Sequence, residues 1–144
     1  MAQADQEFDY LLDEQVGFLL RQVNQRHLSI FTNSIKDLTP TQFATLAKMR
    51  EIGAVSQNDL GRQTAMDAAT MKGVVDRLSK RGLVCTKPDP SDQRRILVEL
   101  EPLAYSLLDE MLERAHKISD ETLAPLKKAE QKQLINLLKK VLDR

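Results

Sequence analysis

Residues 56–100 read SQNDLGRQTAMDAATMKGVVDRLSKRGLVCTKPDPSDQRRILVEL, and this stretch carries two helix signals followed by two strand signals. Ser56 can accept a hydrogen bond from the free amides of a first helical turn, and Asp59 places a carboxylate near the positive end of that helix. Asp67 provides a second helix start. After it, apolar residues recur at helical spacing: Met71, Val74, Val75 and Leu78. The pattern predicts two short helices, the second packing one stripe inward.

The second predicted helix has small residues on its outward face, among them Ala69, Thr70 and Gly73. Small side chains let a helix backbone come close to base edges in a DNA major groove. Lys72 and Arg77 could then reach phosphates or a guanine edge. A short amphipathic hairpin in some other all-helical domain would show the same pattern, so this segment alone leaves both interpretations open.

The segment that follows favours the first interpretation. Gly82 is placed to end the helix in a left-handed conformation, and residues 83–86 are β-prone. Residues 87–95 contain two prolines and read as a turn, before a second strand over 96–100. Two helices and a hairpin with a basic tip form a winged helix-turn-helix. We therefore predict a mainly α fold with a small β-hairpin wing, joined to a helical dimerisation frame.

Several motifs resemble the MarR family of bacterial transcriptional regulators. They are LTPTQF at 38–43, the helix at 60–64, DRL at 76–78 with GLV at 82–84, and above all DPSDQRR at 89–95. The resemblance covers roughly residues 8–142. It implies a homodimer, a recognition helix in the major groove and a wing arginine in the minor groove. It also implies release from the operator when a small molecule, often an aromatic acid, binds between the frame and the reading head.

The resemblance also assigns roles within the wing. Asp92 would hold the wing by pairing with an arginine, and Arg94 would be the arginine of the Asp-x-Arg pattern, with Arg95 as an extra basic group. The chain departs from the family at Thr86, where an arginine is frequent. It departs again at Gly73, which costs ~1 kcal/mol relative to alanine in a helix interior.

Charge is distributed unevenly along a chain whose formal net charge is zero. Residues 60–95 hold eight basic and four acidic side chains, a local net charge of +4, whereas residues 1–20 hold five acids and no base. DNA phosphates respond to the local field rather than to the total charge. A charge cluster alone more often marks a solvated surface, but beside a wing it favours nucleic-acid binding.

The flanking regions read as helices with broad apolar faces, over about 8–35, 41–52 and 102–123, and after Pro125. The first would be roughly 40 Å long, more than a monomer of this size covers. An apolar face left exposed on the last helix would favour aggregation, so a second subunit is expected to cover it. We assign 1–37 and 101–144 to dimerisation and 38–100 to DNA binding, within one compact chain.

An effector pocket is the hypothesis for His27, which lies on the apolar stripe of the first helix. Imidazole or guanidinium could bind the acid of an aromatic carboxylate, and rings could form apolar walls. The proposed pocket residues are Arg21, Asn24, His27, Phe31 and Phe43. The alternative is a core or interface histidine satisfied by one hydrogen bond.

Other classes of function find less support. The single Cys85 excludes an internal disulfide framework and fits a reducing cytoplasm; in a strand it is more often a small buried hydrophobe than an oxidation sensor. We expect no signal peptide, and the sequence contains no apolar run of about 18 residues, no phosphate loop and no metal-ligand spacing. We therefore predict neither an enzyme nor a cofactor or metal protein. A helical protein-protein adaptor would leave the basic wing without a role.

The sequence thus predicts a cytoplasmic, dimeric regulator, most simply a repressor, that binds a pseudo-palindromic operator with half-sites roughly 10 base pairs apart and takes a small aromatic acid as effector. On the recognition helix we expect Thr70, Lys72 and Arg77 to contact DNA. Backbone contacts are expected from Ser56, Gln57 and Arg62, and wing contacts from Arg94 and Arg95. Redox sensing through Cys85 stays open as an alternative.

Overall fold

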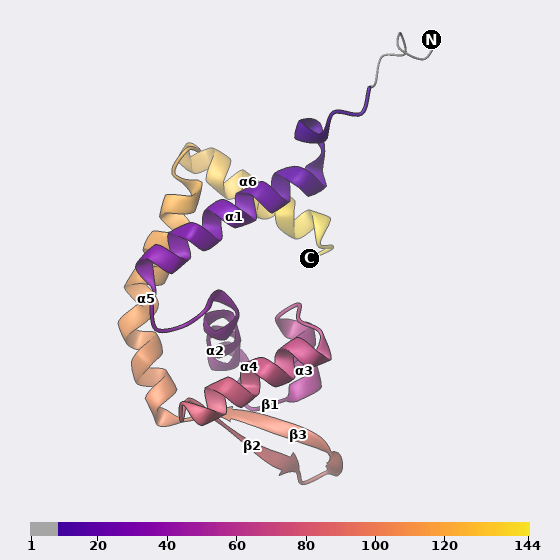
Figure 1. Cartoon of the computed structure of the whole chain (residues 1–144), viewed down its shortest axis with the longest axis vertical. Helices are drawn as coiled ribbons and strands as arrows, with labels where there is room; N and C mark the ends of the chain where they lie inside the picture. Colours follow the sequence, from indigo (N-terminus) through magenta and orange to yellow (C-terminus); the bar gives the residue numbers. More distant parts are fainter. Residues whose placement is uncertain (1–8) are drawn as a thin grey trace, which may run out of the picture. The chain divides into compact units, whose positions relative to one another are not determined.

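The computed structural model of the chain describes residues 9–144 and is mainly helical, with one small antiparallel sheet (Figure 1). After a 3₁₀ turn at Leu12–Glu14, the elements are α1 (Val16–Ser34), α2 (Pro40–Ile52), β1 (Val55–Ser56), α3 (Gln57–Gln63), α4 (Ala68–Lys80), β2 (Val84–Asp89), β3 (Asp92–Leu100), α5 (Pro102–Leu123) and α6 (Lys128–Val141). This is the predicted winged helix-turn-helix with flanking helices. No helix in the described part of the chain has the length and apolar character to cross a membrane.

The chain divides into two compact units. We call residues 32–117 the reading head, and the described residues up to 31 together with 118–144 the helical frame. These divisions fall inside α1 and α5, which are continuous helices; the predicted division of roles at 37/38 and 100/101 stays a prediction. The role of each unit stays a prediction at this point.

The reading head encloses its own apolar core. Leu46 on α2, Leu60 on α3, Leu78 on α4 and Val98 on β3 have no exposed surface. Helix α2 starts as predicted after Thr39, with Pro40 at its first position; a capping box joins Thr39 to Gln42, each side chain accepting from the other's backbone amide. Four elements therefore converge on one closed centre.

The α3–α4 turn brings its two helices close together. A Cβ on Gly61 would lie 3.0 Å from the carbonyl oxygen of Met66, so only glycine fits there without a shift. Ala65 adopts a left-handed conformation with φ 56°, and Gly82 ends the α4 segment with φ 73°, as the sequence predicted for Gly82. The turn thus sets the spacing between the two helices.

The sheet has the strand order β1-β3-β2, and the short strand at Val55 pairs with Val98. The predicted turn over 87–95 is wrong in extent, because β2 continues to Asp89 and β3 begins at Asp92. A cross-strand ion pair between Lys87 and Glu99, 2.6 Å between Nζ and Oε1, extends the hairpin. Pro88 is tolerated because β2 is an edge strand.

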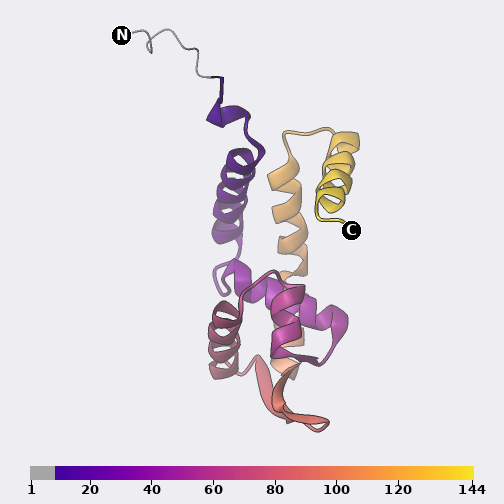
Figure 2. The same ribbon diagram turned by 90° about the vertical axis from the view of Figure 1, so that its right-hand side faces the viewer.

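The helical frame contains parts of α1 and α5 together with α6, and Figure 2 shows the end of α5 between the other two. Arg26 donates to the carbonyl of Glu121 (2.8 Å), and Gln131 donates to the carbonyls of Leu123 and Leu126. The predicted first helix over 8–35 is too long in the described part of the chain. It begins at Val16, because Gln15 is extended and its side chain donates to the Leu11 carbonyl.

Candidate nucleic-acid interface

Helix α4 is anchored by one face and presents the other to solvent. Met71, Val74, Val75 and Leu78 are buried, whereas Ala69, Thr70, Lys72 and Arg77 are exposed and Gly73 is half-buried. Asp67 caps the helix by accepting from the Thr70 amide at 2.8 Å, and this hydrogen bond lowers the pKa of the Asp67 carboxyl. The outward side is small at its N-terminal end, as a helix entering a major groove requires.

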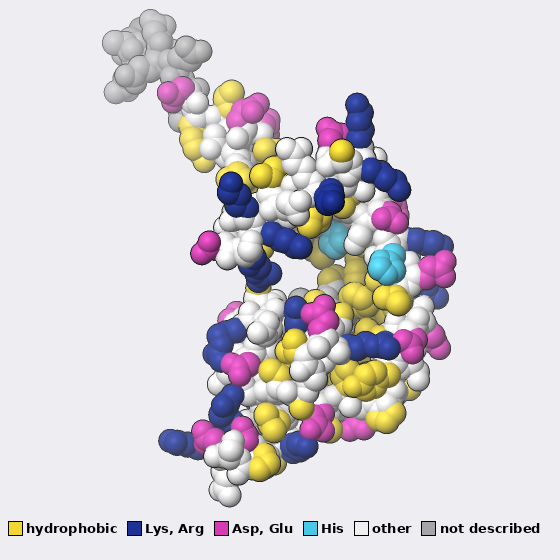
Figure 3. Space-filling model, turned by 180° about the vertical axis from the view of Figure 1, so that it is seen from behind, with side chains coloured by type: hydrophobic (Ala, Val, Ile, Leu, Met, Phe, Trp, Pro, Cys, Tyr) yellow, Lys and Arg dark blue, Asp and Glu magenta, His cyan; other side chains and the backbone are white. Residues whose placement is uncertain are grey.

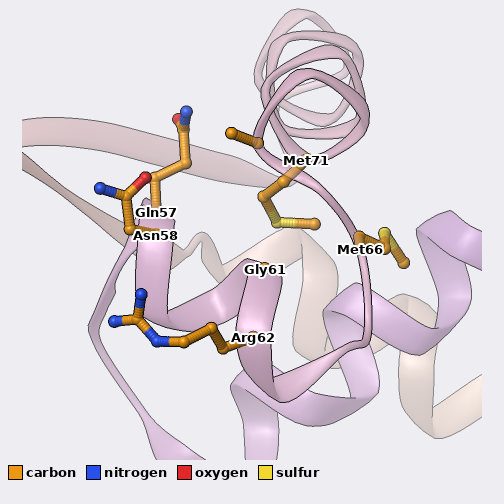
Figure 4. A pocket seen from close by; sticks show the side chains of 7 residues that line it. Gln57, Asn58, Gly61, Arg62, Met66 and Met71 are labelled. Atoms are coloured by element: carbon orange, nitrogen blue, oxygen red, sulfur yellow. The ribbon is translucent and has the colours of Figure 1, made fainter.

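Helix α3 contributes polar side chains next to α4. Gln57, Asn58 and Arg62 border a cavity of about 170 Å³, and the Met71 side chain points into the space between the two helices (Figure 4). Ser56 is buried, and its hydroxyl accepts from the Asp59 amide at 3.2 Å, so its side chain acts as the cap of α3. Asn58 was not among the residues predicted to contact DNA, although it is exposed beside Gln57.

The wing carries a cation that lies almost wholly in solvent. Arg94 has 95% of its side chain exposed; its amide donates to Asp92 Oδ1 at 3.0 Å, and its Nε lies 3.6 Å from the same oxygen. Asp89 accepts from both the amide and the hydroxyl of Ser91, and these bonds lower the pKa of the Asp89 carboxyl. The tip of the wing is therefore an ordered turn that holds Arg94 in solvent.

Asp59 joins the wing to α3, a contact that the sequence analysis missed. Its Oδ2 accepts from Arg95 Nη2 at 3.1 Å, and its Oδ1 pairs with Arg62. Thirty-six positions separate Asp59 from Arg95, so no local spacing signals their pairing. The acidic residue near the start of α3 was explained only by the helix dipole.

The interface mixes charges rather than presenting cations alone. Lys72 pairs with Asp76 along α4, 3.1 Å between Nζ and Oδ2, and Arg62 and Arg95 share Asp59. On the face shown in Figure 3, basic and acidic side chains lie close together around the wing. Lys72 and Arg62 pair within their own helices and Arg95 pairs across elements, whereas Arg94 has only a longer contact of 3.6 Å with Asp92 in its own turn. Arg94 is therefore better placed than these three cations to meet phosphate.

The predicted effector residues fall in both units. His27 Nδ1 lies 2.8 Å from the hydroxyl of Thr122, so the histidine joins α1 to α5 within the frame. Phe31 is buried, and Arg21 and Asn24 are exposed on α1. Phe43 belongs to the reading head, where it lines an open cleft of about 400 Å³ with Ala47, Arg50, Leu108 and Leu112. Assembly of the predicted pocket stays a prediction.

Cys85 is half-buried in β2 beside Glu101. A hydrogen bond with Glu101, together with burial, raises the pKa of the Cys85 thiol. Because the thiolate is the species that reacts with oxidants, this environment makes the residue a poor sensor. Within residues 9–144, no group of three or more His, Cys, Asp and Glu side chains could hold a metal ion.

Comparison with known proteins places the chain in a family. The model of the MarR family matches residues 38–96, which span helices α2 to α4 and most of the wing. The HTH-type transcriptional repressor NicR of Pseudomonas putida is 43% identical over 93% of this chain and 86% of its own length. The chain belongs to the MarR family. It is a winged helix-turn-helix transcriptional regulator.

Two solved structures resemble this MarR-family chain closely. A probable transcriptional regulator from Pseudomonas aeruginosa is 51% identical, with a TM-score of 0.87 over 91% of this chain and 99% of its own. Bordetella bronchiseptica BpsR is 41% identical, with a TM-score of 0.88 over 94% of this chain and 98% of its own. The BpsR structure concerns regulation of its DNA binding by 6-hydroxynicotinic acid.

Proposed function

We propose that this MarR-family regulator is a homodimeric repressor that leaves a pseudo-palindromic operator when an aromatic carboxylate binds. The observation that carries the proposal is the pairing of a small outward face on α4 with a wing whose Arg94 is 95% exposed. A helix with small outward residues can approach base edges, and an exposed arginine beside it can enter the minor groove or contact phosphate.

Dimerisation is supported by the helical frame. Its apolar side chains remain in solvent in a single chain: Val16, Leu19, Leu20 and Val23 on α1, and Ile135, Leu137, Leu138 and Val141 on α6. Monomeric soluble proteins rarely expose contiguous apolar areas of this kind. A second copy supplies a matching surface by symmetry, and two reading heads then meet two half-sites of the operator.

The nature of the effector is inferred from chemistry and from relatives. BpsR responds to 6-hydroxynicotinic acid, a hydroxylated pyridine carboxylate, and NicR is a transcriptional repressor. In this chain, Arg21 and His27 on α1 would bind the carboxylate, and Phe31 on the same helix would contact the ring. Binding would shift the population toward a dimer whose reading heads are wrongly spaced for the operator.

The proposal is tested by fluorescence anisotropy on the promoter region upstream of the gene and on a random duplex of equal length, at two salt concentrations. We expect tighter binding to the promoter, with a log-log salt slope near −0.9 for each phosphate contacted. Addition of 6-hydroxynicotinate should release the protein from the promoter. Benzoate is tested beside it as an aromatic acid without a ring nitrogen or hydroxyl group. Equal affinity for both duplexes would contradict operator recognition.

Variants separate the parts of the proposal. Arg94→Ala should weaken binding to both duplexes and reduce the salt slope by about one contact, whereas Thr70→Ala should change the preference between promoter sequences. His27→Ala should abolish the response to the acid and leave promoter binding intact. If neither acid changes DNA affinity or melting temperature, the effector part of the proposal fails while the repressor part stands.

A further inference from the structure

We propose that Asp59 is a positioning residue for DNA recognition, which fixes the wing against α3 by holding Arg95 and directs Arg62 at the same time. The inference rests on the proposed DNA-binding function and deepens it. It divides the adjacent wing arginines into a DNA contact, Arg94, and a structural tether, Arg95.

The Asp59 carboxylate joins the wing to α3 beyond the strand pairing at the base of the wing. Asp59 lies in the first turn of α3, and its two carboxylate oxygens are used separately, Oδ2 by Arg95 and Oδ1 by Arg62. The β1–β3 pairing of Ser56 with Leu97 ties β3 to the chain entering α3. Arg95 lies two residues further toward the tip, so its ion pair with Asp59 extends that connection along the wing.

Exposure separates the two arginines. The Arg94 side chain is 95% exposed and its ion pair lies within its own turn, whereas Arg95 is 47% exposed and reaches another element. Both arginines border a small cavity of about 80 Å³, together with Gln57 and Asn58 from α3 and Ile96 from β3. The tether therefore runs beside the polar side chains that α3 offers to DNA.

Electrostatics alone would argue against an acid at this place. A carboxylate on a surface that meets phosphate repels the DNA backbone, and two cations shared with it are partly neutralised. This electrostatic repulsion is offset if the Asp59 carboxylate fixes the orientation of the wing, because a wing held at a fixed angle loses less conformational entropy when it enters a groove. Asp59 would then contribute to discrimination between DNA sequences rather than to attraction.

A role of Asp59 through its charge and a role through positioning predict different effects on DNA affinity. If charge decides, Asp59→Asn should tighten binding to every duplex, and Arg95→Ala should weaken it. If positioning decides, both substitutions should lower the ratio of promoter to random-duplex affinity, by about three- to tenfold, the range expected for one partly exposed ion pair with some network coupling. The double variant should then lose no more than either single variant.

The experiment measures dissociation constants by anisotropy on promoter and random duplexes for wild type, Asp59→Asn, Arg95→Ala and the double variant. Glu99→Gln is the matched control, because it removes the same charge and breaks an ion pair inside the wing rather than between the wing and α3. Asp59→Glu should restore most of the ratio. Melting temperatures establish that each variant folds, and Arg95→Ala tests the same tether should Asp59→Asn unfold.

The outcomes are distinct. A reduced ratio for Asp59→Asn and Arg95→Ala, with Glu99→Gln unchanged, supports the tether. Equal tightening on both duplexes by Asp59→Asn, with additive effects in the double variant, overturns it and leaves DNA binding intact. Failure of the wild type to prefer the promoter overturns the proposed function itself.

Discussion

The reading head and the helical frame handle their apolar residues in opposite ways. In the reading head, Leu60 and Val98 have no exposed surface, and five large apolar side chains are exposed among the described residues, against thirteen in the smaller frame. In the frame, Val16 is 71% exposed and Val141 is 79% exposed, although both lie on helices with clear apolar stripes. The reading head thus covers more of its apolar residues with its own chain, whereas the frame leaves many of them exposed.

This difference assigns DNA recognition to the reading head and association between subunits to the frame. A closed reading head can hold α4 and the wing rigidly, so its surface residues are available for recognition. An open frame cannot satisfy its apolar face alone, and burial of such surface is worth about 25 cal/mol per Å². Folding of one region is therefore local, whereas completion of the other depends on association.

The largest predicted effect comes from placing a charge on the open face. Leu20→Asp should leave the protein monomeric at micromolar concentration and weaken promoter binding about a hundredfold or more, because the second reading head no longer binds intramolecularly. Ile52→Asp is the control, since Ile52 has similar exposure (41% against 45%) but belongs to the reading head. Sedimentation and anisotropy measure both. Identical behaviour of the two variants would remove the distinction between the regions.

The next effect sharpens the closed side of the comparison. Leu60→Ala should lower the free energy of unfolding by about 3 kcal/mol, because it leaves a cavity in a fully buried position. Urea unfolding followed by circular dichroism gives the value. Leu19→Ala, at a 44% exposed position in the frame, should act through the dimer, so its effect should grow on dilution. A concentration-dependent loss for Leu60→Ala alone would contradict the assignment.

A smaller effect distinguishes two glycines of the reading head. Gly73→Ala should stabilise α4 by about 1 kcal/mol, since the added Cβ would meet only the Arg77 guanidinium, at 3.6 Å. Gly61→Ala should destabilise, because its Cβ would lie 3.0 Å from the Met66 carbonyl oxygen. Melting temperatures check the signs. A stabilised Gly73→Ala protein that binds the promoter less tightly would show that the groove floor approaches this residue, whereas a destabilised one would contradict the helix argument.

The smallest effect concerns acid. Folding lowers the pKa values of Asp67 and Asp89, so both carboxylates stabilise the reading head above the pKa of the unfolded chain. That stabilisation is lost as the pH falls below about 4 and through the lowered pKa values. Asp67→Asn should therefore flatten the acid side of the stability profile, measured as melting temperature from pH 6 to pH 3. An unchanged profile would show that the Thr70 hydrogen bond contributes nothing to the charge state.

Local signals predicted most of the reading head. Thr39 with Pro40, Asp67 and Gly82 fixed helix ends that the structure confirms, because caps depend on neighbouring residues only. The long turn over 87–95 was wrong because residues 87–89 pair with β3 across the hairpin, and a reading along the chain does not show cross-strand pairing. The start of α1 was wrong because apolar periodicity continued through the extended Gln15.

The part of the candidate site that depends on neighbouring residues in the chain could also be predicted. Exposed positions on α4 follow from helical periodicity, and Arg94 follows from its motif. The sequence predicted Ser56 both as a helix cap and as a DNA contact. The structure confirms the cap, and the DNA contact stays a prediction. The Asp59–Arg95 contact depends on how β3 pairs with β1, so it required the three-dimensional fold.

The central claim is that the reading head folds around its own core, whereas the exposed apolar face of the frame is covered by a second copy of the chain. Native mass spectrometry of the purified full-length protein, alone and mixed with the promoter duplex, tests it most directly. We predict a species with two chains in the free protein and two chains for each duplex in the complex. A monomer at micromolar concentration that binds the duplex one to one, with unchanged affinity, would contradict it.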